Sequence, residues 1–188
     1  MNRQQQPLAL LFFGLRRQLL STLLIVGSVL LCVLLSFARL PGMELLGIGP
    51  NWLLIWVVVW SLPRSTLLGT IAGLALGWIQ DGLTSPYPSH ALTLSLVGFL
   101  AARLGKNPYL RDNFIALLWI VFVLAGLAEI VTALQYVLQE VRYGAGTGAP
   151  PLLWRDCERI ALSAAVLSSL WAPAFAYPFN SCWKKLVR

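Results

Sequence analysis

Charged residues are scarce in this sequence, and their scarcity argues against a soluble globular protein. Asp, Glu, Lys and Arg make up 11% of the 188 residues, whereas a soluble domain has about 25%. Hydrophobic residues make up 58% of the chain. We therefore expect an all-α integral membrane protein, folded as a single polytopic domain over residues 1–188, with much of its apolar surface in lipid.

Histidine and cysteine are also rare, which removes most metal and disulfide chemistry. One histidine, His90, cannot build a histidine-based metal cluster. The three cysteines, Cys32, Cys157 and Cys182, lie far apart and in different expected segments. Neither an intramolecular disulfide nor a metal site is expected.

The common catalytic and nucleotide-binding motifs are missing from the sequence. It has no G-x-S-x-G, no H-E-x-x-H, no P-loop and no dinucleotide-binding fingerprint. Catalysis would depend on Asp81, Glu129 and little else. We predict that the protein is not an enzyme, with no catalytic residues and no cofactor.

Long apolar runs, in contrast, fill most of the chain. Six of them are candidate membrane spans, at about 19–37, 45–62, 65–80, 90–102, 113–138 and 160–180. A straight helical span needs about 20 residues, and the third and fourth runs are shorter. We expect these two to be tilted, broken or partly re-entrant, with their backbone sheltered by protein. No small-residue cleavage site follows the first run, so we expect it to be retained as a helix.

The distribution of basic residues indicates the topology. The net charge of +7 is not clustered on one helix, so it does not indicate nucleic-acid binding. If the N-terminus is inside, ten of the 14 Lys and Arg residues fall in inner segments and four in outer ones. Because cytoplasmic loops are enriched in Lys and Arg, we predict six spans with both termini cytoplasmic.

The segment GTIAGLALGWIQDGLTSPYPSH, residues 69–90, joins an apolar helix to a polar end. Gly69, Gly73 and Gly77 repeat every four residues and form one stripe along the expected helix. Small residues at this spacing let another membrane helix approach closely. The stripe therefore indicates either packing within the chain or contact with a partner protein.

Asp81 follows the stripe on the same side of the helix, at the outer end of the third span. It is either an ordinary interfacial acid that ends the helix, or a functional carboxylate that fixes the next turn or pairs with a basic group of a partner. His90 opens the fourth span, and Glu129 is the one charge within the fifth. Because the three residues share one predicted depth, they could form an outer polar pocket; separate interfacial residues are the alternative.

Trp52, Trp56 and Trp60 form a second stripe with four-residue spacing. Such a stripe is typical of a helix face that packs against protein or lipid. A wall on which a ligand stacks is the alternative interpretation.

The stretch GLALGWIQDGLTSPYPSHALTLSLVGFLAARL, residues 73–104, resembles the MreD family of rod shape-determining proteins. The family pattern is a glycine-containing helix, an aspartate, a short turn with proline, and a small-residue or histidine start to the next apolar helix. The matching positions here are Gly73, Gly77, Asp81, Pro86, His90 and Ala91. Ser89 stands where the family usually has glycine.

The resemblance implies a non-enzymatic component of the bacterial cell-wall elongation machinery, in the inner membrane, that helps to maintain cell shape. It implies membrane lipid and the single-span scaffold protein MreC as partners, and through MreC the actin-like MreB, the glycosyltransferase RodA and a transpeptidase. Neither nucleic acid nor a small-molecule ligand is expected. The fold of the family is thought to resemble the substrate-binding subunit of energy-coupling-factor transporters.

That likeness supplies the alternative function, a vitamin-binding subunit of an energy-coupling-factor transporter. Such subunits have a similar size and six helices, and they hold a small ligand in a pocket open to the outside. The tryptophan stripe and the trio Asp81, His90 and Glu129 would suit such a pocket. Against this, the residues around Asp81 match the shape-protein pattern better, and no inner small-residue motif marks docking to a transporter partner.

Overall fold

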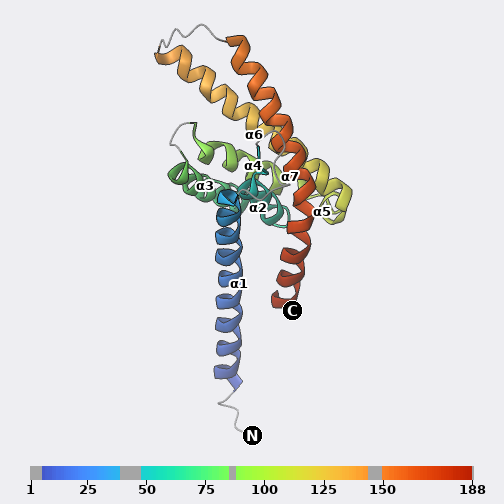
Figure 1. Cartoon of the computed structure of the whole chain (residues 1–188). Helices are drawn as coiled ribbons and strands as arrows, with labels where there is room; N and C mark the ends of the chain where they lie inside the picture. Colours follow the sequence, from blue (N-terminus) through green and yellow to red (C-terminus); the bar gives the residue numbers. More distant parts are fainter. Residues whose placement is uncertain (1–5, 39–47, 85–87, 144–149, 188) are drawn as a thin grey trace.

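The computed structural model describes residues 6–38, 48–84, 88–143 and 150–187, and this part of the chain is helical almost throughout (Figure 1). Its helices are α1 (Gln6–Phe37), α2 (Trp52–Ser61), α3 (Thr66–Leu83), α4 (His90–Leu104), α5 (Pro108–Asp112), α6 (Phe114–Tyr143) and α7 (Pro150–Val187). The expected all-α fold is therefore confirmed.

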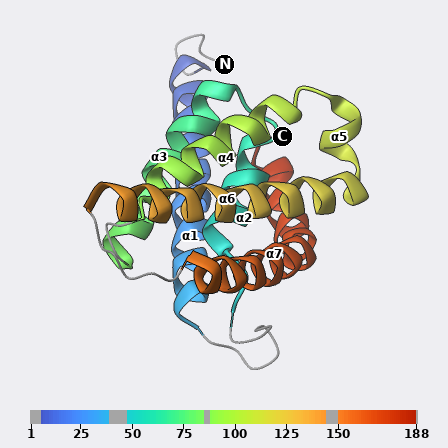
Figure 2. The ribbon, with the colours of Figure 1, turned by 90° about the horizontal axis from the view of Figure 1, so that it is seen from above.

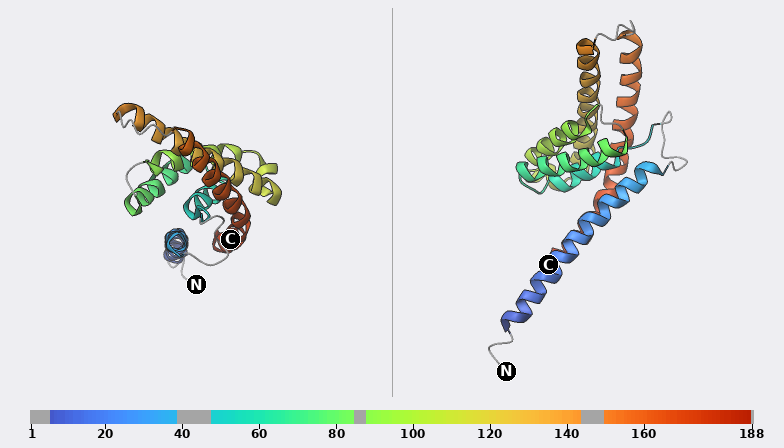
Figure 3. Two further views of the ribbon diagram at one scale, coloured as in Figure 1. Left: turned by 45° about the horizontal axis from the view of Figure 1, so that its top comes forward. Right: turned by 90° about the vertical axis from the view of Figure 1, so that its left-hand side faces the viewer.

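Three long helices determine the shape of the molecule. α1 extends from the centre toward the N-terminus, and α6 and α7 form a hairpin that extends to the opposite side (Figures 1 and 3). The shorter helices α2, α3 and α4 lie between these two ends (Figure 1). In the view from above, α6 crosses over α1 and α2 (Figure 2). α7 continues past α2 and ends on the side of α1, so that it contacts both.

Among the described residues, three stretches are long and apolar enough to cross a membrane. They are Arg16–Phe37 in α1, Phe114–Gln139 in α6 and Ala161–Trp183 in α7. The apolar helices α2 and α4 are shorter. Every residue from Trp52 to Val59 of α2 is buried, as expected for a helix that is apolar on all sides. α2 is therefore the centre around which the other helices pack.

The helix bounds depart from the expected spans in two ways. The second span was expected from residue 45, whereas α2 begins at Trp52; residues 45–47 lie outside the described part. The cause is Asn51, whose Oδ1 accepts a hydrogen bond from the backbone N of Leu54 at 3.1 Å and caps the helix. α1 and α7, in contrast, extend well beyond the expected 19–37 and 160–180.

Two prolines lie inside α7 without ending it. The helix continues through Pro173 and Pro178 to Val187. Membrane helices tolerate proline because neighbouring helices and local adjustments satisfy the freed backbone groups. The number of spans that cross the membrane stays a prediction.

Candidate functional site

The glycine stripe of α3 packs against α4. Gly69, Gly73 and Gly77 are all buried. A Cβ atom added at Gly73 would collide with the backbone carbonyl of Leu94, and Gly69 and Gly98 exclude a side chain from each other in the same way. Because only glycine permits this approach of two backbones, the structure uses the stripe for packing inside the chain.

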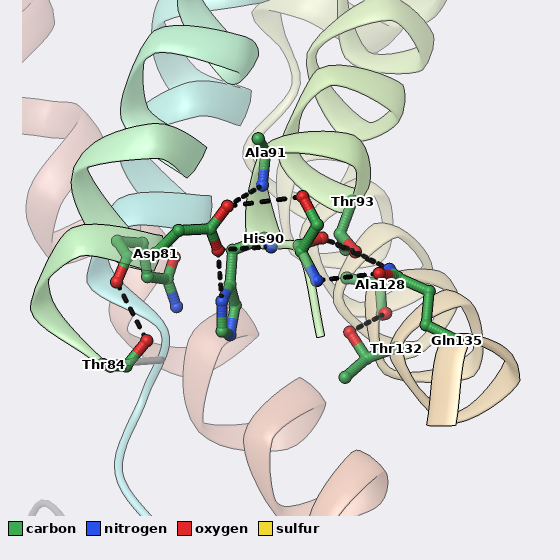
Figure 4. A network of polar contacts seen from close by, with 10 residues as sticks. Asp81, Thr84, His90, Ala91, Thr93, Ala128, Thr132 and Gln135 are labelled. Atoms are coloured by element: carbon green, nitrogen blue, oxygen red, sulfur yellow. Dashed lines mark hydrogen bonds and ion pairs between the residues drawn. The ribbon is translucent and has the colours of Figure 1, made fainter. Parts of the chain in front are cut away.

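Asp81 lies in the last turn of α3, and its carboxylate contacts the first turn of α4 (Figure 4). Its Oδ1 accepts a hydrogen bond from the backbone N of His90 at 2.6 Å and lies 2.9 Å from Nδ1 of the His90 ring. Its Oδ2 accepts from the backbone N of Ala91 and from Oγ of Ser89, both at 3.3 Å. Ser89 is the residue that precedes α4, but its side chain accepts no hydrogen bond from the backbone of α4. Asp81 therefore caps α4 from a neighbouring helix, at a helix N-terminus where negative charge is favoured.

These contacts bear on the two functional roles open to Asp81. The donors all come from its own chain, and 15% of its side chain is exposed. A carboxylate that is satisfied internally has little capacity left for the basic group of a partner. The geometry therefore favours the role of fixing the turn between α3 and α4.

A glutamine of α6 extends this polar network to a third helix. The backbone N of Ser89 donates to Oε1 of Gln135 at 2.8 Å. Nε2 of Gln135 in turn donates to the carbonyl of Ser89 and to Oγ1 of Thr93, both at 3.2 Å (Figure 4). Gln135 is absent from the sequence-based prediction, although an amide within an apolar run is a visible signal. Its role depends on a contact across 46 residues of sequence, which no local pattern reveals.

The predicted polar trio is only partly assembled. His90 and Asp81 are in direct contact. Glu129 lies partly buried on α6 and within electrostatic reach of His90, but its side chain makes no hydrogen bond with another described residue. A common outer pocket of these three residues stays a prediction.

Two rows of aromatic residues face each other between α2 and α7. The first is the predicted stripe Trp52, Trp56 and Trp60, and the second, with the same four-residue spacing, is Trp171, Phe175, Phe179 and Trp183. The ring centroids of Trp52 and Trp171 are 5.8 Å apart, and those of Trp56 and Phe179 are 6.3 Å apart. The tryptophan stripe therefore packs mainly inside the protein. The α7 row is missing from the sequence-based prediction, although its spacing is visible in the sequence.

Arg64 lies at one end of both rows. Its guanidinium carbon is 3.9 Å from the ring centroid of Trp60 and 4.7 Å from that of Trp183, and its Nη1 donates to the carbonyl of Trp60 at 2.9 Å. Burial lowers the pKa of Arg64 from its ordinary value, yet a guanidinium stays protonated in proteins. No carboxylate of a described residue forms an ion pair with it.

An apolar cleft of about 510 Å³ opens between α1 and α7, and Trp52 of α2 also lines it. On α1 it is lined by Leu24, Gly27, Ser28, Leu31 and Leu35; on α7 by Trp171, Ala174, Phe175, Pro178, Phe179 and Cys182. Beside the cleft, Nε1 of Trp56 donates to Oγ of Ser28 at 2.8 Å and ties α2 to α1. The cleft belongs to the size class of small-molecule pockets, about 300–1,000 Å³.

The described residues contain no group of three or more His, Cys, Asp and Glu side chains that could hold a metal ion. Cys32 and Cys182 are free thiols, one buried and one exposed. The side chain of Cys157 lies outside the described part. The observed arrangement is one of packing, capping and apolar surface.

Comparison with known proteins adds the family. No curated protein and no solved structure matches the chain. The family model of the rod shape-determining protein MreD matches residues 16–174, which includes the glycine stripe, Asp81 and the capped start of α4. The chain therefore belongs to the MreD family of rod shape-determining proteins.

Proposed function

We propose that this protein is a non-enzymatic component of the bacterial cell-wall elongation machinery that helps to maintain cell shape by binding a membrane scaffold protein. Membership of the MreD family supports a rod shape-determining role in a membrane. The scaffold would be a single-span protein of the MreC type, and through it the chain would be linked to MreB, RodA and a transpeptidase. The family match gives no support to the vitamin-binding alternative.

The observation that carries this proposal is the exposed face of α1. In the most apolar part of its candidate span, 6% of the residues are buried, against 28% and 44% in those of α6 and α7. Six of its eight exposed large apolar residues follow one another at spacings of three or four, and residues at such spacings lie on one face of a helix, where a partner helix can pack. We call this set the α1 stripe: Leu19, Leu23, Val26, Leu30, Leu34 and Phe37. The scaffold span would pack along it.

The glycine stripe and the polar residues near Asp81 would support this function by stabilising the fold, without contacting the scaffold. The stripe of Gly69, Gly73 and Gly77 and the cap made by Asp81 hold α3 and α4 together. In this proposal they keep the packed helices α2, α3 and α4 rigid, so that α1 is held in one orientation. His90 and Glu129 would join Asp81 in one polar group where α3, α4 and α6 meet.

The membrane arrangement in this proposal has six spans in the inner membrane and both termini in the cytoplasm. The excess of basic residues in the segments that would then be cytoplasmic supports it, with ten of 14 Lys and Arg residues there. The short helices α2 and α4 would be two of the six spans, with their backbone sheltered by the helices that pack around them. A likeness to the substrate-binding subunit of energy-coupling-factor transporters is part of the same proposal.

The decisive experiment is a mild-detergent pull-down of the tagged full-length protein from its native membrane, with mass spectrometry of all co-purifying proteins and small molecules. Recovery of a single-span scaffold together with cell-wall synthases is expected. Recovery of paired ATPases with a bound vitamin would overturn the proposal.

A further inference from the structure

We propose that the cleft between α1 and α7 binds one anionic phospholipid, with an acyl chain in the cleft and the phosphate at Arg64. Nothing in the shape-determining role requires such a site. It rests on three features that meet at one place: an apolar cleft, an aromatic wall and an arginine without a carboxylate partner among the described residues.

The cleft provides the site for the tail. Its lining consists of aliphatic and aromatic side chains, apart from Ser28 and Cys182. Gly27 widens it, because a Cβ atom added there would meet nothing within 4 Å. The α7 wall is smooth, since the rings of Phe175 and Phe179 are stacked with their planes 16° apart. An extended hydrocarbon chain fits such a surface without leaving a polar group unsatisfied.

The aromatic wall leads from the cleft to a positive charge. Phe179 lines the cleft and stacks on Trp183, with their ring centroids 6.3 Å apart. The guanidinium carbon of Arg64 lies 4.7 Å from the ring centroid of Trp183. The rings hold Arg64 in place while several of its donors remain free of ion pairs. Trp60 beside it has a buried Nε1 with no acceptor among the described residues. A phosphate group is the ligand that a planar, fixed guanidinium binds best.

A second arginine lies at the same end, on the cleft face of α1. Arg17 is seven residues before Leu24 and fourteen before Leu31, both of which line the cleft. Positions seven apart share one face of a helix. Arg17 is exposed, and the N-terminal part of α1 and the C-terminal part of α7 lie on the same side of the molecule (Figure 1). The basic end of the cleft is therefore suited to a negatively charged headgroup.

The test uses the full-length protein, purified in detergent and stripped of lipid. It is titrated with phosphatidylglycerol or with phosphatidylcholine of identical acyl chains, and bound lipid is counted by native mass spectrometry. One phosphatidylglycerol should bind more tightly than phosphatidylcholine. Arg64→Gln and Arg17→Gln should each weaken phosphatidylglycerol binding about fivefold. Arg16→Gln is the matched control, because Arg16 is also exposed but lies one position off the cleft face.

A glycine pair tests the tail site separately from the headgroup site. Gly27→Leu should fill the cleft and abolish binding of both lipids while leaving thermal unfolding unchanged. Gly126→Leu on α6 is the control, since a Cβ atom there also meets nothing within 4 Å but lies outside the cleft. Arg17→Gln keeps the headgroup test valid even if Arg64→Gln loosens the stacked rings.

Two outcomes would overturn the proposal. Equal binding of both lipids, unaffected by either arginine variant, would show that no headgroup site exists. Absence of bound lipid from the isolated protein, combined with loss of a co-purifying single-span protein in Gly27→Leu, would assign the cleft to a partner helix instead.

Discussion

Asp81 joins two helices through one side chain. Most helices are capped by the residue that immediately precedes them, but α4 receives its cap from a residue eight positions before Ser89, on α3. The acid thus ties the end of one helix to the start of the next. A partner's basic group is not needed to explain it.

We expect the change Asp81→Ala to lower the free energy of unfolding by about 1.5–3 kcal/mol, because a hydrogen-bonded charge is lost from a mostly buried cap. Asp81→Asn keeps one acceptor oxygen and should cost less. Thermal unfolding in detergent measures both. The two variants should still bind the scaffold in proportion to the folded protein recovered; loss of binding at full stability would instead favour pairing of Asp81 with a partner.

Gln135 carries a second prediction at this scale. In Gln135→Leu the partly buried backbone N and carbonyl of Ser89 lose their hydrogen-bond partners, so the free energy of unfolding should fall by about 1–3 kcal/mol. Gln139→Leu, four residues further along α6, is the control, because the side chain of Gln139 makes no hydrogen bond with another described residue. Equal unfolding temperatures for the two variants would refute a structural role for Gln135.

At the scale of elements, the contact between α3 and α4 depends on the absence of side chains. Glycine is costly inside a helix, by about 1 kcal/mol relative to alanine, so buried glycines need a compensating gain. The gain here is the close approach of the two backbones at Gly69, Gly73 and Gly98.

Gly73→Ala should therefore destabilise the protein by about 1–3 kcal/mol through overpacking, although alanine is the better helix former. Gly82→Ala in the same helix is the matched control, because a Cβ atom at Gly82 meets nothing within 4 Å. It should be neutral or stabilising by up to about 1 kcal/mol. Thermal unfolding of both variants in one detergent gives the comparison, and a stabilised Gly73→Ala would contradict the packing seen between α3 and α4.

At the scale of the whole molecule, α1 is the least enclosed of the three long helices. Its inner faces contact α2 and line the cleft, whereas the α1 stripe faces outward. We expect a photo-crosslinking residue at Leu23 or Leu30 to capture a single-span membrane protein in native membranes. Ile130 on α6 is the control, because its exposed fraction of 64% lies between those of Leu30 and Leu23, at 57% and 73%; it should capture lipid only. Equal yields from α1 and α6 would refute α1 as the docking helix.

Much of this architecture follows from local patterns in the sequence. The low charge, the apolar runs and the four-residue spacings of glycine and tryptophan depend on neighbours along one helix, where backbone geometry alone decides which residues share a face. They were sufficient to predict an all-α membrane protein with a close-packed third helix and an acid at its end, whereas the MreD family followed from the resemblance of residues 73–104 to the family pattern. Helix ends were predicted less well, because α2 starts at the cap made by Asn51 and α7 continues through two prolines.

Only the tertiary structure decided what those residues contact. The capping of α4 by Asp81, the contact of Gln135 with Ser89 and the position of Arg64 on the ring of Trp183 join residues from different helices. Such contacts depend on how helices cross and how far each one extends, and no periodicity along a single helix contains that information. The sequence by itself determined the class of the protein and the faces of its helices, while packing between helices decided that α1 is left exposed and that a cleft opens beside it.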